Sequence, residues 1–162
     1  MENTPAPEVR TLLAYVSAGG AAGEYAGVIA DVLTSEGYDV EVVDLKREKV
    51  RDLAPYANVV VGTGVRMMMV YRHAKRFLAR RDLRGKRLAI YLASGMAVEE
   101  PEQARGRFLE TLIKRNRLTP VTYIALPGKM PGGERGRLID HTDPDAARAW
   151  AEDLAGRLRS AD

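Results

Sequence analysis

The sequence predicts a three-layer α/β sandwich, in which helices cover both faces of a parallel sheet of five strands. Two observations support this fold class. Short apolar runs of strand length recur along the chain, and segments with apolar residues at helical spacing separate them. Strands that alternate with helices form parallel sheets, because a long crossover must return the chain to the same end of the sheet. The five expected strands are residues 12–16, 38–44, 58–62, 86–93 and 121–126.

Four segments carry apolar residues three and four positions apart, which is the spacing of one helix face. Their apolar positions are Tyr25, Val28, Ile29, Val32 and Leu33; Val70, Ala74, Phe77 and Leu78; Phe108, Leu109, Leu112 and Ile113; and Ala147, Trp150, Ala151, Leu154 and Leu158. Gly37 is expected to end the first helix. Asp143 as N-cap and Pro144 as the first helical residue are expected to begin the last one.

Two connecting segments have a less regular pattern. Residues 46–57 are charged and interrupted by Pro55, so we expect a short helix or a turn. Residues 127–142 are rich in Gly and Pro and are expected to form an extended surface loop. No repeat or linker divides the chain, so a single domain is expected over residues 11–160, preceded by a flexible tail at residues 1–10.

Composition excludes several classes of protein. Apolar residues make up 46% of the 162 residues and charged residues 29%, as in ordinary globular proteins. The chain contains no cysteine, which excludes disulfides, thiolate metal sites and cysteine nucleophiles. No apolar run approaches the length of a membrane span, and the first ten residues lack the apolar stretch of a signal peptide. A cytoplasmic protein is therefore expected.

The charge is distributed unevenly along the chain. Residues 61–120 carry 14 Lys and Arg against 5 Asp and Glu, whereas residues 1–60 carry 5 against 10. A basic middle third attracts anionic partners, such as phosphate, carboxylates, lipid headgroups or nucleic acid. An arginine-rich but merely solvated surface explains the same composition, and the sequence leaves both explanations open.

The loop at residues 17–23 joins the first strand to the first helix. Its small residues, Ser-Ala-Gly-Gly-Ala-Ala-Gly, allow backbone N–H groups and the positive end of the helix to converge on one point, where a phosphate binds favourably. Its spacing matches neither a Walker loop nor the G-x-G-x-x-G fingerprint. A tight turn that packs the helix closely on the sheet is the alternative explanation.

This arrangement of loops after the first, third and fourth strands resembles the flavodoxin fold. The resemblance implies that the protein binds FMN, with the phosphate in the first loop and the isoalloxazine ring between the other two. The residues implied are Ser17, Ala18, Gly19, Gly20, Ala21 and Ala22 for the phosphate, and Thr63, Gly64, Val65, Arg66, Met67, Ser94, Gly95 and Met96 for the ring. In doubly wound sheets such loops meet at the topological switch point, where ligands bind.

Within this fold, the chain most resembles the flavodoxin-like, quinone-dependent protoporphyrinogen oxidases. The resemblance is carried by Val-Gly-Thr-Gly-Val-Arg at 61–66, by Tyr-Arg-His-Ala at 71–74 with Phe77, and by Pro-Gly-Gly-Glu at 131–134 with Thr-Asp at 142–143. It implies that electrons pass from a substrate to a quinone or a redox protein. The basic middle third then fits the carboxylates of a porphyrin or an anionic membrane surface.

Two positions depart from the flavodoxin pattern. Flavodoxins usually place a Thr where Ala22 stands, so one hydroxyl donor to the phosphate is missing. A hydrogen bond to a charged group contributes about 1.5–3 kcal/mol, so its loss weakens binding about tenfold to a hundredfold. Many flavodoxins also stack a tyrosine in the loop that here contains residues 94–96, which has no aromatic residue. The nearest aromatic residue after the preceding loop is Tyr71, which the helical pattern also accommodates.

Several other side chains allow more than one role. Arg66 contacts a substrate carboxylate or the flavin, or it is an ordinary surface residue. Met67, Met68 and Met69 are expected on a helix, where they point in different directions and leave at least one exposed near the loop. His73 is a candidate proton relay, although a surface histidine is the commoner case, and His141 lacks the clustered partners of a metal site.

The sequence thus favours an FMN-binding oxidoreductase or electron carrier with a quinone or a redox protein as partner. Peripheral contact with an anionic membrane surface and a homodimer belong to the same hypothesis. The alternative is a flavodoxin fold that has lost flavin and serves as a binding or interaction module. Binding of nucleic acid is the weakest hypothesis, because no exposed aromatic residues interleave with the basic ones and no known motif is present.

Overall fold

The computed structural model describes residues 10–17 and 20–160, and in them it shows the predicted parallel sheet of five strands. The order across the sheet is β2-β1-β3-β5-β6, and every neighbouring pair on this path is parallel. The strands are β1 (Arg10–Val16), β2 (Asp39–Asp44), β3 (Asn58–Arg66), β5 (Arg87–Ser94) and β6 (Thr122–Pro127). Numbered along the chain, these five strands have the doubly wound order 2-1-3-4-5. Arg10, predicted as part of the tail, is already the first residue of β1.

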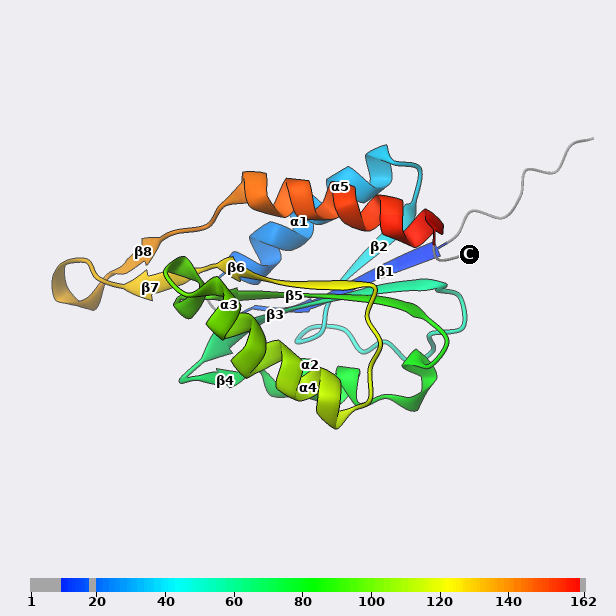
Figure 1. The fold of residues 1–162 in the computed structure, drawn as a ribbon, viewed down its shortest axis with the longest axis horizontal. Helices are drawn as coiled ribbons and strands as arrows, with labels where there is room; N and C mark the ends of the chain where they lie inside the picture. The colour runs from blue at the N-terminus through cyan, green and yellow to red at the C-terminus, as the bar shows by residue number, and fades with distance from the viewer. Residues whose placement is uncertain (1–9, 18–19, 161–162) are drawn as a thin grey trace, which may run out of the picture.

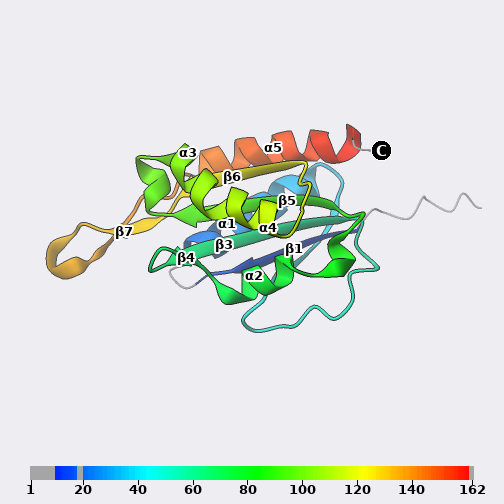
Figure 2. The same ribbon diagram turned by 60° about the horizontal axis from the view of Figure 1, so that its bottom comes forward.

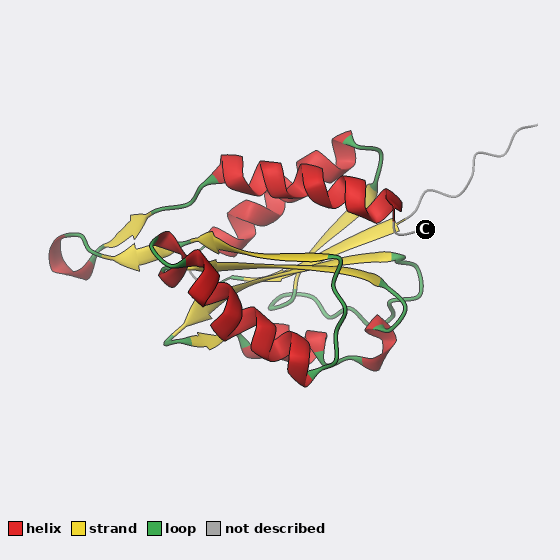
Figure 3. Cartoon of the chain, in the orientation of Figure 1, coloured by secondary structure: helices red, strands yellow, loops and turns green. Residues whose placement is uncertain are grey.

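Helices cover both faces of the sheet, which confirms the three-layer architecture (Figures 1 and 3). α1 (Ala21–Ser35) and α5 (Pro144–Ser160) pack on one face, over a cluster that includes Leu13, Val60 and Tyr91. The other face carries α2 (Arg72–Leu78) and a continuous helical segment made of α3, η3 and α4 (Pro101–Ala104, Arg105–Glu110 and Thr111–Arg115). The described part of the chain also contains three short 3-10 turns, η1 (Arg81–Leu83), η2 (Met96–Val98) and η4 (Glu134–Gly136).

The central strands are apolar on both faces because helices cover both. Leu12, Leu13 and Ala14 in β1, like their counterparts in β3 and β5, are fully buried. β2 lies at the edge of the sheet, and most of its residues are exposed or half-buried. For this reason, polar and apolar residues alternate in the sequence of this edge strand, whereas the central strands are apolar runs.

The predicted helix ends are confirmed. The Asp143 carboxylate accepts a hydrogen bond from the Ala146 N–H at 3.1 Å, and Pro144 is the first residue of α5. Gly37 follows α1 with a φ of +96°, and its N–H donates to the Thr34 carbonyl at 3.0 Å.

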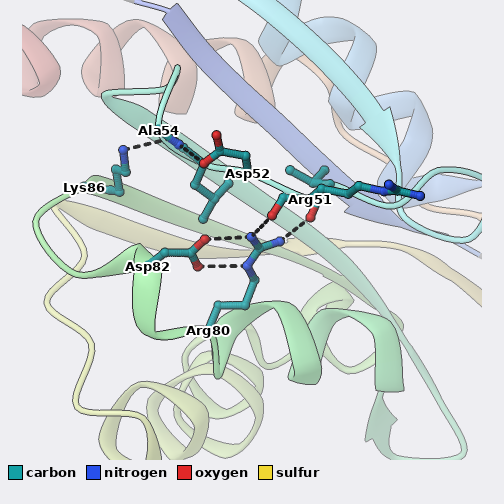
Figure 4. Close-up of polar contacts among 8 residues, drawn as sticks. Arg51, Asp52, Ala54, Arg80, Asp82 and Lys86 are labelled. Carbon is teal, nitrogen blue, oxygen red and sulfur yellow. Dashed lines mark hydrogen bonds and ion pairs between the residues drawn. The ribbon is translucent and has the colours of Figure 1, made fainter.

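Of the two expectations for residues 46–57, the turn is confirmed, since no helix forms there. Side chains satisfy carbonyls that a helix would otherwise use (Figure 4). The Arg80 guanidinium donates to the carbonyls of Val50, at 2.5 Å, and Arg51, at 3.2 Å. The same group forms two hydrogen bonds with the Asp82 carboxylate, which lower the pKa of Asp82. An arginine from the segment between α2 and η1 therefore anchors this turn through two of its carbonyls.

The expectation of an extended loop at 127–142 is wrong, because this segment contains a β-hairpin. β7 (Lys129–Pro131) pairs antiparallel with β8 (Leu138–Asp140), and Figure 1 shows the hairpin projecting beyond the end of the sheet. The His141 N–H donates to the Gly128 carbonyl at 3.1 Å and closes the base of the hairpin. Three-residue strands flanked by Gly and Pro have no periodicity that a sequence pattern reveals.

Candidate functional site

The carboxyl ends of four strands surround a cleft of about 440 Å³. It lies beside the switch point between β1 and β3, where ligands of doubly wound sheets bind. Residues from all three predicted loops meet there. The predicted site residues that line it are Ser17, Ala21, Ala22, Gly64, Val65, Arg66, Met67, Ser94 and Gly95.

The first loop ends at the positive end of α1. Gly20 has a φ of +93°, and its N–H donates to the Ser17 hydroxyl oxygen at 3.0 Å. Among residues 10–17 and 20–160, no side chain caps this helix, whose first N–H groups have no partner within it. Ala21 and Ala22 line the cleft. Predicted residues Ala18 and Gly19 lie outside the described part of the chain. The described loop is thus suited to an anion.

Lys129 is a cleft residue that the sequence reasoning missed. It belongs to β7, yet its Nζ lies 3.1 Å from Glu24 Oε1 in the first turn of α1. A Cβ atom on Gly20 would lie 3.4 Å from the same Nζ. The hairpin therefore places an ammonium group over the first loop. No local pattern around residue 129 reveals this, because the contact joins residues 105 positions apart.

A second lysine contacts the other side of the first loop. Lys46, which follows β2, donates from Nζ to the Ser17 carbonyl at 3.2 Å. The same Nζ lies 5.0 Å from the centroid of the Tyr71 ring, which is cation–π geometry. Lys46 thus connects the first loop to Tyr71 at the start of α2.

Tyr71 supplies an aromatic side chain to the cleft. It is the N-cap residue of α2, is half-buried and lines the cleft opposite the first loop. A Cβ atom on Gly64 would lie 3.0 Å from Tyr71 Cε2, so the glycine leaves room for the ring. Burial raises the pKa of the Tyr71 hydroxyl, and the charge of Arg66 opposes this rise. The aromatic residue that the loop at 94–96 lacks is therefore provided by the β4–α2 junction.

The second loop is a β-hairpin and not the start of a helix, which corrects the expectation for the three methionines. β3 continues to Arg66 and pairs antiparallel with β4 (Met69–Val70), so Val70 belongs to a strand and α2 begins later. Met67 and Met68 form the two-residue turn, with φ of 50° and 63°. Met67, Met68 and Met69 are 87%, 48% and 59% exposed. The exposure predicted for at least one of them holds for all three.

This turn is made of residues that disfavour its conformation. A left-handed residue other than Gly, Asn or Asp costs about 1–2 kcal/mol, and two-residue hairpin turns prefer Asn-Gly. We therefore expect the double substitution Met67→Asn/Met68→Gly to raise the free energy of unfolding by about 1–2 kcal/mol. Urea unfolding followed by circular dichroism measures it. Met69→Asn, which lies in β4 outside the turn, is the control and should give no gain.

The remaining predicted residues lie around the cleft without lining it. Thr63 is fully buried, and its hydroxyl donates to the Gly64 carbonyl at 2.9 Å. Met96 packs against the core, and its N–H donates to the Ser94 hydroxyl oxygen at 3.1 Å. His73, on α2, is exposed and does not line the cleft. Thr63 and Met96 thus support the two loops, while the adjacent residues Gly64 and Gly95 line the cleft.

A family model described as the flavodoxin domain matches residues 12–129 of this sequence. The chain belongs to the flavodoxin domain family. The matched segment includes all three loops of the cleft and ends at Lys129.

Solved structures of flavodoxins share the fold of this flavodoxin domain at low sequence identity. Flavodoxin from Streptococcus pneumoniae TIGR4 has a TM-score of 0.65 at 15% identity, over 95% of this chain and 100% of that one. Flavodoxin 2 from Bacillus cereus has 0.62 at 19%, over 95% and 100%. The flavodiiron core of Flv1 from Synechocystis sp. PCC6803 has 0.68 at 15%, over 97% of this chain and 38% of that one. No curated protein matches this flavodoxin domain significantly.

These comparisons support the coarser of the functional predictions. They support an FMN-binding electron-transfer protein, because FMN is the cofactor of flavodoxin domains. They give no support to the protoporphyrinogen oxidase group, to a quinone, to membrane contact or to dimerisation. Among the helices of residues 20–160, none has the length and apolar character that crossing a bilayer requires.

Proposed function

We propose that this flavodoxin domain binds FMN in the cleft at the switch point and exchanges electrons with a redox partner. The observation that carries the proposal is the convergence of an uncapped helix N-terminus, an ammonium group and an aromatic ring on one cleft of about 440 Å³. A flavin mononucleotide has the matching chemistry, since it joins a phosphate to a flat, largely apolar ring.

The phosphate end of the proposed site is the first loop. Among the described residues of this loop, the neutral donors that face the cleft are the Ser17 hydroxyl and the N–H groups of Ala21 and Ala22. Lys129 adds a positive charge beside Gly20, in the same loop whose Ala22 lacks the usual hydroxyl. A charge-assisted hydrogen bond is about twice as strong as a neutral one, so the lysine compensates for the lost hydroxyl.

The ring end lies between the hairpin residues Val65–Met67 and the loop at 94–95, with Tyr71 as the aromatic wall. Pro131 and Leu138 of the β7–β8 hairpin close the remaining side. When bound, FMN supplies one- and two-electron redox chemistry, and the protein contributes binding, orientation and exclusion of water. Arg66, exposed at the rim, adds positive charge near the proposed ring position.

The finer prediction of a protoporphyrinogen oxidase that reduces a quinone stays a prediction. Its support is the basic middle third, where residues 61–120 carry 14 Lys and Arg against 5 Asp and Glu. The wild-type activity test is the oxidation of protoporphyrinogen with a soluble quinone by the FMN-loaded protein. If the protein oxidises protoporphyrinogen no faster than free FMN does, the finer prediction is wrong and electron transfer between proteins remains the proposed function.

Retention of FMN tests the proposal directly. The purified chain is mixed with FMN, desalted and examined for the flavin absorption bands, with a fluorescence titration to obtain Kd. Riboflavin, which lacks the phosphate, is the matched control ligand. We expect retained flavin bands and FMN binding at least tenfold tighter than riboflavin binding. A colourless protein after desalting would contradict FMN binding and favour the alternative of an interaction module.

A further inference from the structure

A second hollow lies on the sheet face that carries α2 and the η3–α4 segment. It is a groove of about 130 Å³ between the β3–β4 hairpin, α2 and that helical segment. Figure 2 brings this face forward and shows the hairpin beside the helices. Its apolar lining includes Met68, Met69, Phe108 and Leu112.

The charges around this groove have one sign. Lys75, Arg107 and Arg115 line it, and among the described lining residues none is acidic. Arg107 lies over the Phe108 ring, with its guanidinium carbon 5.8 Å from the ring centroid. A groove with an apolar floor and cationic walls complements a surface that is apolar at its centre and acidic at its edge.

The groove and the cleft share the β3–β4 hairpin. Met67 lines the cleft on one side of this hairpin, whereas Met68 and Met69 line the groove on the other. A molecule seated in the groove therefore lies next to the proposed ring end of the cleft. Methionine side chains are flexible and polarisable, which suits contacts with a partner protein.

We propose that this groove docks an acidic redox protein, whose apolar patch contacts Met68 and Met69 while its carboxylates pair with Lys75, Arg107 and Arg115. The redox role of the partner rests on the proposed function, whereas the docking itself follows from the groove. An anionic bilayer is the competing occupant. Its headgroup surface is broad and flat, whereas the apolar residues here line a hollow between the hairpin and the helices.

Nuclear magnetic resonance of the full-length, isotopically labelled protein tests the docking. The titrant is an acidic plant-type [2Fe–2S] ferredoxin, and basic cytochrome c is the charge-inverted control. We expect ferredoxin to shift the amide signals of residues 66–70 and 105–115, and its Kd to rise at least tenfold between about 50 and about 200 mM salt. Cytochrome c should leave these signals unchanged. No ferredoxin shift at these residues, or equal shifts with both proteins, would overturn the proposal.

Charge reversal provides the matched variants. Lys75→Glu/Arg107→Glu should weaken ferredoxin binding about tenfold or more, whereas Arg148→Glu/Arg157→Glu, on α5 of the opposite face, should leave it within about twofold. Met67→Asn/Met68→Gly should weaken binding although it favours the hairpin fold. Equal effects of the two charge-reversal pairs would mean that overall charge, and not the groove, attracts the partner.

Three further outcomes are informative: one identifies the occupant of the groove, and two separate the docking proposal from the proposed function. If the protein sediments with phosphatidylglycerol vesicles, if Lys75→Glu/Arg107→Glu abolishes this sedimentation, and if ferredoxin causes no shifts, then the groove binds a membrane and not an acidic protein. Ferredoxin docking in the groove by a chain that retains no FMN would support the docking site and overturn electron transfer. FMN retention without docking would overturn only the groove proposal.

Discussion

Gly62→Ala is expected to lower the free energy of unfolding by about 3 kcal/mol or more, because the new methyl group has no room. Gly62 lies in the middle of β3, directly beside Tyr91 in β5. A Cβ atom there would lie 1.9 Å from Tyr91 Cζ. The tyrosine is fully buried, its hydroxyl donates to the Ala22 carbonyl at 2.8 Å, and its ring meets Trp150 edge-on at 6.1 Å. Since α1 and α5 hold the ring in place, the strand itself has to move.

Urea unfolding measures this loss, and another glycine provides the control. Gly27 lies on α1 with nothing within 4 Å of an added Cβ, so Gly27→Ala should stabilise the protein by about 0.5–1 kcal/mol. In a Tyr91→Ala background the clash is gone, and Gly62→Ala should then cost less than about 1 kcal/mol. A similar large loss in both backgrounds would show that something other than the tyrosine ring excludes the methyl group.

Lys129→Met is expected to weaken FMN binding about tenfold to a hundredfold and to leave riboflavin binding unchanged. The reason is that the Lys129 ammonium lies over the first loop, beside Gly20, where the proposed phosphate binds. The salt dependence of the FMN Kd should also become shallower, because one charge of the site is lost. Fluorescence titrations with both flavins at several salt concentrations provide the measurement.

The ion-pair partner of Lys129 gives a prediction of opposite sign. Glu24 lies in the first turn of α1 and repels a phosphate there, so Glu24→Gln should tighten FMN binding while riboflavin binding stays the same. The control for Lys129→Met is Lys114→Met, which lowers the net charge by the same amount but lies on α4, away from the cleft lining. It should leave the FMN Kd within about twofold. An equal loss of FMN and riboflavin affinity in Lys129→Met would assign the lysine to the hairpin structure and not to the phosphate.

The fold was predictable because its signals are local. Burial can be predicted from the spacing of apolar residues that are close in the sequence. This prediction is confirmed for the strand at residues 58–62 and for the helix face of Tyr25, Ile29 and Leu33. The helix ends at Gly37 and Asp143 depend on the chemistry of one residue each. The positions of the three loops then followed from the parallel sheet, because carboxyl ends of parallel strands share one edge.

The errors and the alternatives that the sequence left open concern short segments whose structure depends on distant partners. Residues 46–57 allowed a short helix or a turn, and in the observed turn the Val50 and Arg51 carbonyls accept hydrogen bonds from Arg80, 30 and 29 positions away. The methionine turn and the β7–β8 hairpin consist of strands of two and three residues, too short for any periodicity. In the same way, Lys129 and Tyr71 enter the cleft from elements outside the predicted loops.

The layers, the parallel strands and the three loops at the switch point could be predicted from the sequence, because periodicity and capping are properties of neighbouring residues. What surrounds those loops became visible in the three-dimensional structure alone: the lysine over α1, the tyrosine ring beside Gly64 and the exposed hairpin between cleft and groove. These features arise from contacts between residues far apart in the chain. Such contacts form only once the sheet has brought its carboxyl ends together, and no local pattern records them.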